Sequence, residues 1–228
     1  FFKNHGMLSV TNRPQWLTIK GGSQEYVKKL TSGFKNKIRL NSKIKNIVRY
    51  KSYVVIEDNK SKEKFDYVFF ACHSDEALEI LKKPTADEIK ILSSLPYQKN
   101  DIILHTDSSI MPQKKLSWAA WNYNIDSPDD SPITLTYNMN ILQNIKTKDA
   151  LLVTLNPKLP ISKGKVIKQL QYTHPKFSKE SVIAQLKNKI ISGKNRTFYS
   201  GAYWGKGFHE DGVKSAYEAV KIFDDVIK

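Results

Sequence analysis

The residues whose types and spacing most clearly indicate a ligand site lie near the end of the chain. There, glycines separate a short apolar run from an amphipathic stretch. Thr197–Tyr199 combines β-branched and aromatic side chains, which is typical of a strand. Gly201, Gly205 and Gly207 follow, and from Glu210 onward apolar residues recur every three or four positions, as in a helix. A helix that begins after such a turn presents free backbone N–H groups, which favour an anionic or hydrogen-bond-accepting ligand. The pattern therefore predicts a polar-ligand site.

A second glycine turn lies near the start of the chain. Gly21 and Gly22 follow a predicted strand at 16–19 and precede a predicted helix at 24–31. This turn is not the GxGxxG fingerprint of dinucleotide-binding βαβ units, which occurs nowhere in the chain.

A third turn carries a thiol beside an imidazole. Cys72 and His73 follow the apolar run 65–70, which is typical of a strand covered on both faces. Such a pair could be a nucleophile and its base, but neighbouring residues of an extended chain point to opposite faces. We therefore interpret Cys72 and His73 as structural or ligand-packing residues.

Further polar candidates lie in the middle of the chain. His105 and Asp107 would share one face of a strand, but a metal site needs a third ligand that the sequence does not place. We interpret them as a polar pair at a strand end and predict no metal site. Aromatic and amide side chains that could wall a ligand cavity also recur there. These candidate substrate-binding residues are Trp121, Asn122, Tyr137 and Asn138.

Composition limits the class of protein. The chain has 228 residues, 40% of them hydrophobic, and a formal net charge of +15. Its lysines are scattered singly and in pairs, which indicates a solvated surface with some electrostatic steering, and we predict no nucleic-acid partner. No run reaches the ~18 apolar residues of a membrane span, and the opening FFKNHG is not a secretory leader. A single cysteine fits a reducing cytoplasm, where we expect the protein.

The order of predicted elements indicates a mixed α/β (α+β) fold with two domains. Residues 18–93 and 191–228 alternate strands and helices, whereas residues 1–17 and 94–190 contain successive strands typical of an antiparallel sheet. The expected strands are 7–10, 16–19, 38–40, 44–50, 53–56, 65–70, 98–105, 117–123, 133–138, 151–155, 166–173 and 197–199. The expected helices are 24–31, 75–81, 84–93, 179–188 and one beginning at 210 or 211.

The amino-acid sequences of several segments resemble those of one flavoprotein superfamily. GAYWGKGFHEDGVKS, GGSQEYV, ACHSDEAL, LHTD, TYNMN and VTLNP are similar to the flavin-containing amine oxidase and protoporphyrinogen oxidase superfamily, in its bacterial branch of NAD/FAD-binding oxidoreductases. The resemblance implies FAD as cofactor and a partial FAD/NAD(P)-binding Rossmann-like domain beside a substrate domain. It also suggests a fatty-acyl or phospholipid substrate, which the positive charge would suit through peripheral contact with an anionic membrane.

The resemblance assigns roles to individual positions. It places the following residues near FAD: Gly21, Gly22, Ile44, Ala71, Cys72, His73, Gly201, Ala202, Gly207, Phe208, His209 and Glu210. Ile44 would offer backbone groups to the adenine, and the backbone N–H groups around His209 would meet the flavin. Lys114 matches, through a loose alignment, a lysine that holds a water near the flavin in some amine oxidases; a surface lysine is the alternative.

The absent fingerprint leaves two alternatives open. In the superfamily it lies upstream, so we expect this chain to be the C-terminal part of a longer protein that lacks its first βαβ unit. Such a chain could be a non-catalytic remnant that binds FAD weakly or not at all. A basic nucleic-acid-binding module is the other alternative, although its aromatic residues lie in runs that are predicted to be buried.

Overall fold

A computed structural model describes residues 9, 11–12, 17–124 and 134–228, which pack as two compact units. The first unit contains residues up to 38 together with 101–171, and the second contains 39–100 and 172–228. By packing, 18–38 belong to the first unit and 94–100 and 172–190 to the second, whereas the predicted boundaries placed 18–38 in the cofactor domain and 94–190 in the substrate domain. Those boundaries concern cofactor and substrate roles and stay a prediction.

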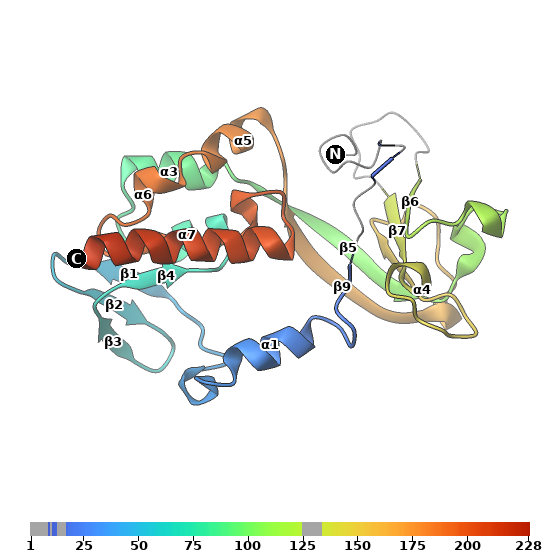
Figure 1. Cartoon of the computed structure of the whole chain (residues 1–228), viewed down its shortest axis with the longest axis horizontal. Coiled ribbons are helices and arrows are strands. Elements are labelled where there is room, and N and C mark those ends of the chain that lie inside the picture. The colour runs from blue at the N-terminus through green and yellow to red at the C-terminus, as the bar shows by residue number, and fades with distance from the viewer. Residues whose placement is uncertain (1–8, 10, 13–16, 125–133) are drawn as a thin grey trace. The chain divides into compact units, whose positions relative to one another are not determined.

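The second unit contains two small sheets. β1 (Asn46–Arg49), β2 (Val54–Glu57) and β3 (Lys62–Phe65) form an antiparallel sheet in that order. β4 (Val68–Phe70) pairs in parallel with β10 (Thr197–Tyr199). The sequence predicts that the terminal strand lies beside the 65–70 run, since both lead into turns that would meet the same cofactor, and this pairing confirms it. The helices of the unit are α2 (Ser74–Ile80), α3 (Ala86–Ser93), α5 (Lys179–Gln185), α6 (Asn188–Ile191) and α7 (His209–Ile227) (Figure 1).

The parallel pair forms the centre of this unit. Phe198 and Tyr199 of β10 are fully buried, and the ring of Phe198 stacks on Phe69 of β4 at 4.5 Å. Helix α7 packs against β10, with the ring of Phe223 edge-on to Phe198. Its first turn carries acidic residues, which suit the positive end of a helix.

The first unit is built on an antiparallel sheet with strand order β6-β7-β8-β5-β9, of which β5, β6, β7 and β9 are labelled in Figure 1. The strands are β5 (Tyr97–His105), β6 (Trp121–Asn124), β7 (Thr134–Asn138), β8 (Leu152–Leu155) and β9 (Val166–Pro175). Residues 97–100 of β5 and 172–175 of β9 belong to the second unit. The unit also contains α1 (Gln24–Thr31), α4 (Met139–Leu142) and the 3-10 turns η2 (Ser108–Ile110), η3 (Lys115–Ser117) and η4 (Lys163–Lys165). The mixed α/β fold with an antiparallel sheet is thus confirmed.

Some local predictions were wrong. Residues 38–40 form no strand because Asn41 adopts a left-handed φ of 57°, which turns the chain and leaves Leu40 81% exposed. The 65–70 run is divided between two sheets, since Phe65 pairs with β2 and Val68 begins the pairing with β10. The described part of the predicted strand 16–19 is irregular. The predicted strand 7–10 lies largely outside the described residues.

Candidate functional site

The carboxyl ends of β4 and β10 bring together two of the predicted cofactor-binding segments. Tyr199 is opposite Phe70 in the parallel register, and the Ser200 N–H donates to the Phe70 carbonyl at 2.8 Å. Residues 71–73 leave one strand and residues 201–202 leave the other, so both turns begin at the same edge of the sheet. In α/β proteins this edge is where ligands bind.

The loop from Gly201 to α7 holds its backbone in conformations that favour glycine. Gly207 has a φ of 90°, and a Cβ there would meet only the Phe177 ring, at 3.8 Å. At Gly201 a Cβ would overlap the ring of the buried Tyr203. These two positions therefore require glycine for different reasons, one for backbone conformation and one for close approach.

The expectation that the N–H groups of this loop are unpaired is wrong at two positions. The Gly207 N–H donates to the Ala202 carbonyl at 3.1 Å, and the Phe208 N–H donates to the Asp211 carboxylate at 2.9 Å. The Asp211 side chain thus caps α7, as an acidic residue in the first helical turn can. A ligand at this helix end would have to share these donors or displace their present acceptors.

Two side-chain polar atoms in the same loop are buried without a hydrogen-bond partner among the described residues. The Tyr203 hydroxyl and the Trp204 indole N–H make no hydrogen bond to any described residue. Gln185 fixes the loop around them by donating to the carbonyls of Tyr203 and Gly205 at 2.9 and 2.6 Å. A buried polar group without a partner costs about 1–3 kcal/mol, so both groups would gain from a hydrogen-bond acceptor brought within their reach.

Cys72 and His73 do not form a nucleophilic pair. The His73 ring stacks on Tyr97 at 4.0 Å, and its Nδ1 lies 3.3 Å from the Thr173 hydroxyl. Burial, with a smaller contribution from Glu76, raises the pKa of the Cys72 thiol to about 11. The thiolate is the reactive form, so a thiol with this pKa is a poor nucleophile near neutral pH.

Cys72 should therefore react slowly with thiol reagents. At neutral pH we expect alkylation by iodoacetamide at least about 100-fold slower than for a small free thiol, whose pKa is about 8.5. The rate should rise with pH up to about pH 11. Equal rates for folded protein and free thiol would contradict this description, and unfolding in urea should remove the difference.

Of the remaining predicted cofactor residues, Gly21, Gly22 and Ile44 lie outside this loop, whereas His209 and Glu210 lie at its end. Gly21 and Gly22 form a turn in the first unit, with the Gly22 N–H donating to the Ile19 carbonyl at 2.9 Å. Ile44 packs, partly buried, against the core of the second unit. His209 and Glu210 are the first two residues of α7. Their roles toward a cofactor stay predictions, as does that of the exposed Lys114, which precedes η3.

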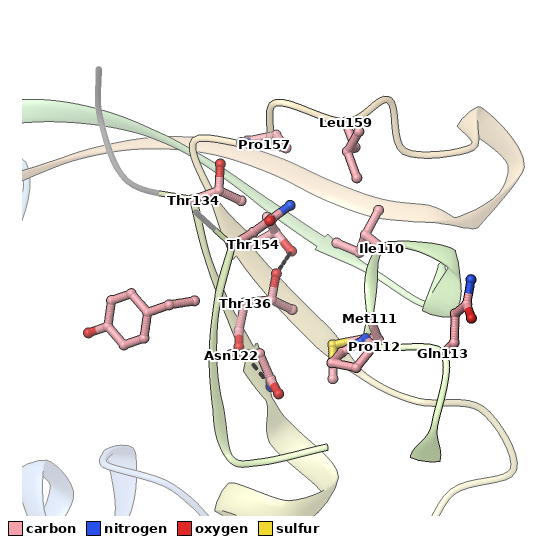
Figure 2. A pocket seen from close by; sticks show the side chains of 12 residues that line it. Ile110, Met111, Pro112, Gln113, Asn122, Thr134, Thr136, Thr154, Pro157 and Leu159 are labelled. Atoms are coloured by element: carbon pink, nitrogen blue, oxygen red, sulfur yellow. Dashed lines mark hydrogen bonds between the residues drawn. The ribbon is translucent and has the colours of Figure 1, made fainter. Parts of the chain in front are cut away.

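A pocket of about 280 Å³ lies in the first unit, over one face of β6, β7 and β8 (Figure 2). Apolar side chains from the 110–112 segment and Leu159 line it together with polar strand residues. The residues around it are 110–113, 122–124, Thr134, Thr136, Thr154, Pro157 and Leu159.

The sheet separates the four predicted substrate-binding residues. Asn122 lines the pocket, but its amide bonds to the backbone of Ala119 and Thr136. Trp121 pairs with Tyr137 across the strands, and their rings meet edge-on at 5.9 Å. Because side chains alternate along a strand, these two rings lie on the face opposite Asn122. Asn138 accepts the Ile141 N–H at 3.3 Å and so caps the N-terminus of α4.

A buried hydrogen-bonded chain that the sequence did not reveal leads to this pocket. The Asp107 N–H donates to His105 Nδ1 at 3.1 Å, so the neutral ring carries its proton on Nε2. Nε2 lies 2.8 Å from the Thr154 hydroxyl, which lies 2.9 Å from the Thr136 hydroxyl (Figure 2). Since both ring nitrogens have partners within the protein, His105 is not available as a metal ligand.

His105 should stay neutral in mildly acidic solution. Burial lowers the pKa of His105, although the nearby Asp107 carboxylate opposes the shift. We expect two-bond proton–nitrogen NMR spectra at about pH 6 to show a protonated Nε2 and an unprotonated Nδ1, whereas an unperturbed imidazole would be largely cationic. A ring with both nitrogens protonated at that pH would contradict the assignment.

Little in the sequence indicates this series of hydrogen bonds between His105, Thr154 and Thr136. The spacing of His105 and Asp107 predicts a polar pair, but the Asp107 carboxylate instead accepts from Ser109, the Ser162 N–H and Lys165. These interactions, led by the Ser162 hydrogen bonds, hold the pKa of Asp107 well below its usual range. Threonine is common in strands, so its recurrence at 134 and 136 does not single out a site.

Two kinds of feature are absent from the described residues. They contain no cluster of three or more His, Cys, Asp or Glu side chains suited to a metal ion. None of their helices is both long and apolar enough to cross a membrane.

Comparisons with known proteins reveal the fold to which the chain is similar. A protein from Exiguobacterium sp. 255-15 proposed to be a protoporphyrinogen oxidase superposes over 99% of this chain and 56% of its own, with a TM-score of 0.64 and 12% identity. The fatty acid isomerase of P. acnes that produces CLA matches 89% of this chain and 52% of its own, with a TM-score of 0.60 and 14% identity. Cyclohexylamine oxidase from Brevibacterium oxydans IH-35A matches 91% and 53%, with a TM-score of 0.58 and 10% identity.

The structural neighbours define the class of fold. The chain has an amine oxidase-like fold and spans about half the length of the structures it matches. No protein-family model matches the sequence. No curated protein matches it either.

Proposed function

We propose that this chain is part of an FAD-dependent oxidoreductase of the amine oxidase-like type. The observation that carries the proposal is the parallel β4–β10 pair, whose two turns and glycine loop meet at one sheet edge before α7. When bound, the isoalloxazine ring would supply the redox chemistry by accepting hydride or electrons. The protein's own task would be to hold and orient it.

The residues at this edge fit such a group. The unpartnered donors of Tyr203 and Trp204 can serve an acceptor, and glycine at 207 leaves room beside the backbone. The start of α7 would favour negative charge. In α7, Val213 is 59% exposed and Ile227 is 53% exposed, which supports a further segment of protein packing on this helix.

A fatty-acyl or other lipid substrate is the finer part of the proposal. It rests on the sequence resemblance and on the structural likeness to a fatty acid isomerase. The net charge of +15 would assist an approach to an anionic lipid surface.

The absorption spectrum tests the proposal. A version extended at its N-terminus by the nucleotide-binding unit should be yellow and hold FAD in stoichiometric amount, whereas this chain alone should bind FAD weakly. A colourless extended protein that stays colourless after incubation with FAD would favour a non-catalytic protein. Stoichiometric FAD on the chain alone would show that the upstream unit is not required.

A further inference from the structure

We propose that the pocket over β6, β7 and β8 binds a small, uncharged carbonyl compound, whose oxygen accepts a hydrogen bond from Thr136. The proposal goes beyond the flavin-dependent function and does not depend on it. It rests on the direction of the hydrogen bonds behind Thr136 and on the chemistry of the pocket wall.

The first step is the direction of the hydrogen-bonded chain. His105 Nδ1 accepts the Asp107 N–H, so the Nε2 proton is donated to the Thr154 hydroxyl. Thr154 is fully buried, and Thr136 is the acceptor within reach of its proton among the described residues. A buried hydroxyl proton without an acceptor is unfavourable, so Thr154 donates to Thr136.

The second step concerns the proton of the Thr136 hydroxyl. Thr136 uses its oxygen to accept from Thr154, and its own proton has no acceptor among the described residues. The residue is only 4% exposed and lines the pocket, so the proton is available to a molecule bound there (Figure 2). A chain of hydrogen bonds polarises its members, which makes this last hydroxyl a better donor.

The hydroxyl proton of the neighbouring Thr134, in contrast, already has an acceptor within the protein. Thr134 lies on the same strand face, lines the same pocket and is 5% exposed. Its hydroxyl, however, donates to the Asn156 carbonyl at 2.6 Å, so its proton is already used. The strand thus offers two similar hydroxyls, of which only that of Thr136 lacks an acceptor for its proton among the described residues.

The third step is the class of ligand. The described residues around the pocket include no Lys, Arg, His, Asp or Glu, so they offer no countercharge to a carboxylate or an ammonium group. Ile110, Met111 and Leu159 provide an apolar wall. A volume of about 280 Å³ suits a small molecule or the end of a larger one. A neutral ketone, ester or amide with a compact apolar part meets these conditions.

A pair of isosteric probes tests the proposal without any flavin. Acetophenone carries the carbonyl, and α-methylstyrene replaces its oxygen with a methylene group. By NMR titration of the full chain, acetophenone should bind about threefold to tenfold more tightly, as expected for one hydrogen bond. Equal affinities for the two probes, or no binding of either, would overturn the proposal.

Matched variants assign the preference to one hydroxyl. Thr136→Val should abolish the preference for acetophenone, and Thr136→Ser should keep it. Thr134→Val removes a hydroxyl from the same wall and should leave the preference unchanged. A preference that survives Thr136→Val in folded protein, checked by its thermal melt, would overturn the assignment, and the wild-type probe pair decides the question if that variant does not fold.

Discussion

Glu88→Gln should lower the free energy of unfolding by about 3–5 kcal/mol, because it leaves a buried guanidinium without its countercharge. The side chains of Arg49 and Glu88 are only 7% and 2% exposed, and they form a bidentate pair across the second unit. Glu88 also accepts from the Tyr199 hydroxyl at 2.8 Å and from the Thr85 N–H at 2.7 Å. A glutamine amide would turn an NH2 group toward groups that are all donors.

The pH dependence of stability should identify the same pair. Burial by itself would raise the pKa of Glu88, but hydrogen bonds from Arg49, Thr85 and Tyr199 outweigh it and the pKa is lowered. A carboxyl with a lowered folded-state pKa contributes stability above its unfolded pKa of about 4.3 and loses it as the pH falls. Glu88→Gln should therefore remove part of the acid sensitivity of the wild-type protein.

Urea unfolding at neutral pH measures the loss of stability, and the same titration repeated as the pH falls through about 4.3 measures the acid sensitivity. As controls, Tyr199→Phe removes one hydrogen bond and should cost about 1 kcal/mol, and the double variant Arg49→Met with Glu88→Leu should recover much of the loss. A Glu88→Gln midpoint close to that of the wild type would show that the pair contributes little.

Gly207→Val should abolish flavin binding by the N-terminally extended protein. Gly207 has a φ of 90°, a region that L-residues enter at a cost of about 1–2 kcal/mol, so the loop before α7 would shift. A Val side chain would also fill the open space beside the turn, where we propose that the cofactor is held. Flavin absorbance per mole of purified protein gives the result.

The control for this variant is a glycine in open surroundings. A Cβ added at Gly164 would meet no described atom within 4 Å, and Gly164 has no left-handed φ, so Gly164→Val should keep the flavin. Thermal melts separate lost binding from lost folding. Full flavin content in Gly207→Val would mean that the loop before α7 is not part of the cofactor site.

Local patterns predict many elements because the causes of those elements are local. The α1 helix has the predicted limits, since its apolar stripe and the turn before it both lie within a few residues. The pairing of β10 with β4 is also predicted, from two apolar runs that each lead into a turn. The predicted strand at 38–40 is wrong because one left-handed asparagine overrides the β-forming residues before it.

The mixed α/β class, the terminal strand, loop and helix, and the candidate cofactor turns all follow from local sequence patterns. Which polar groups meet depends instead on how distant segments fold together. His105 and Thr154 are 49 residues apart, Arg49 and Glu88 are 39 apart, and Tyr199 reaches Glu88 over 111 residues. Hydrogen bonds between strands depend on register and on which face each side chain occupies, and neither is set by the local pattern.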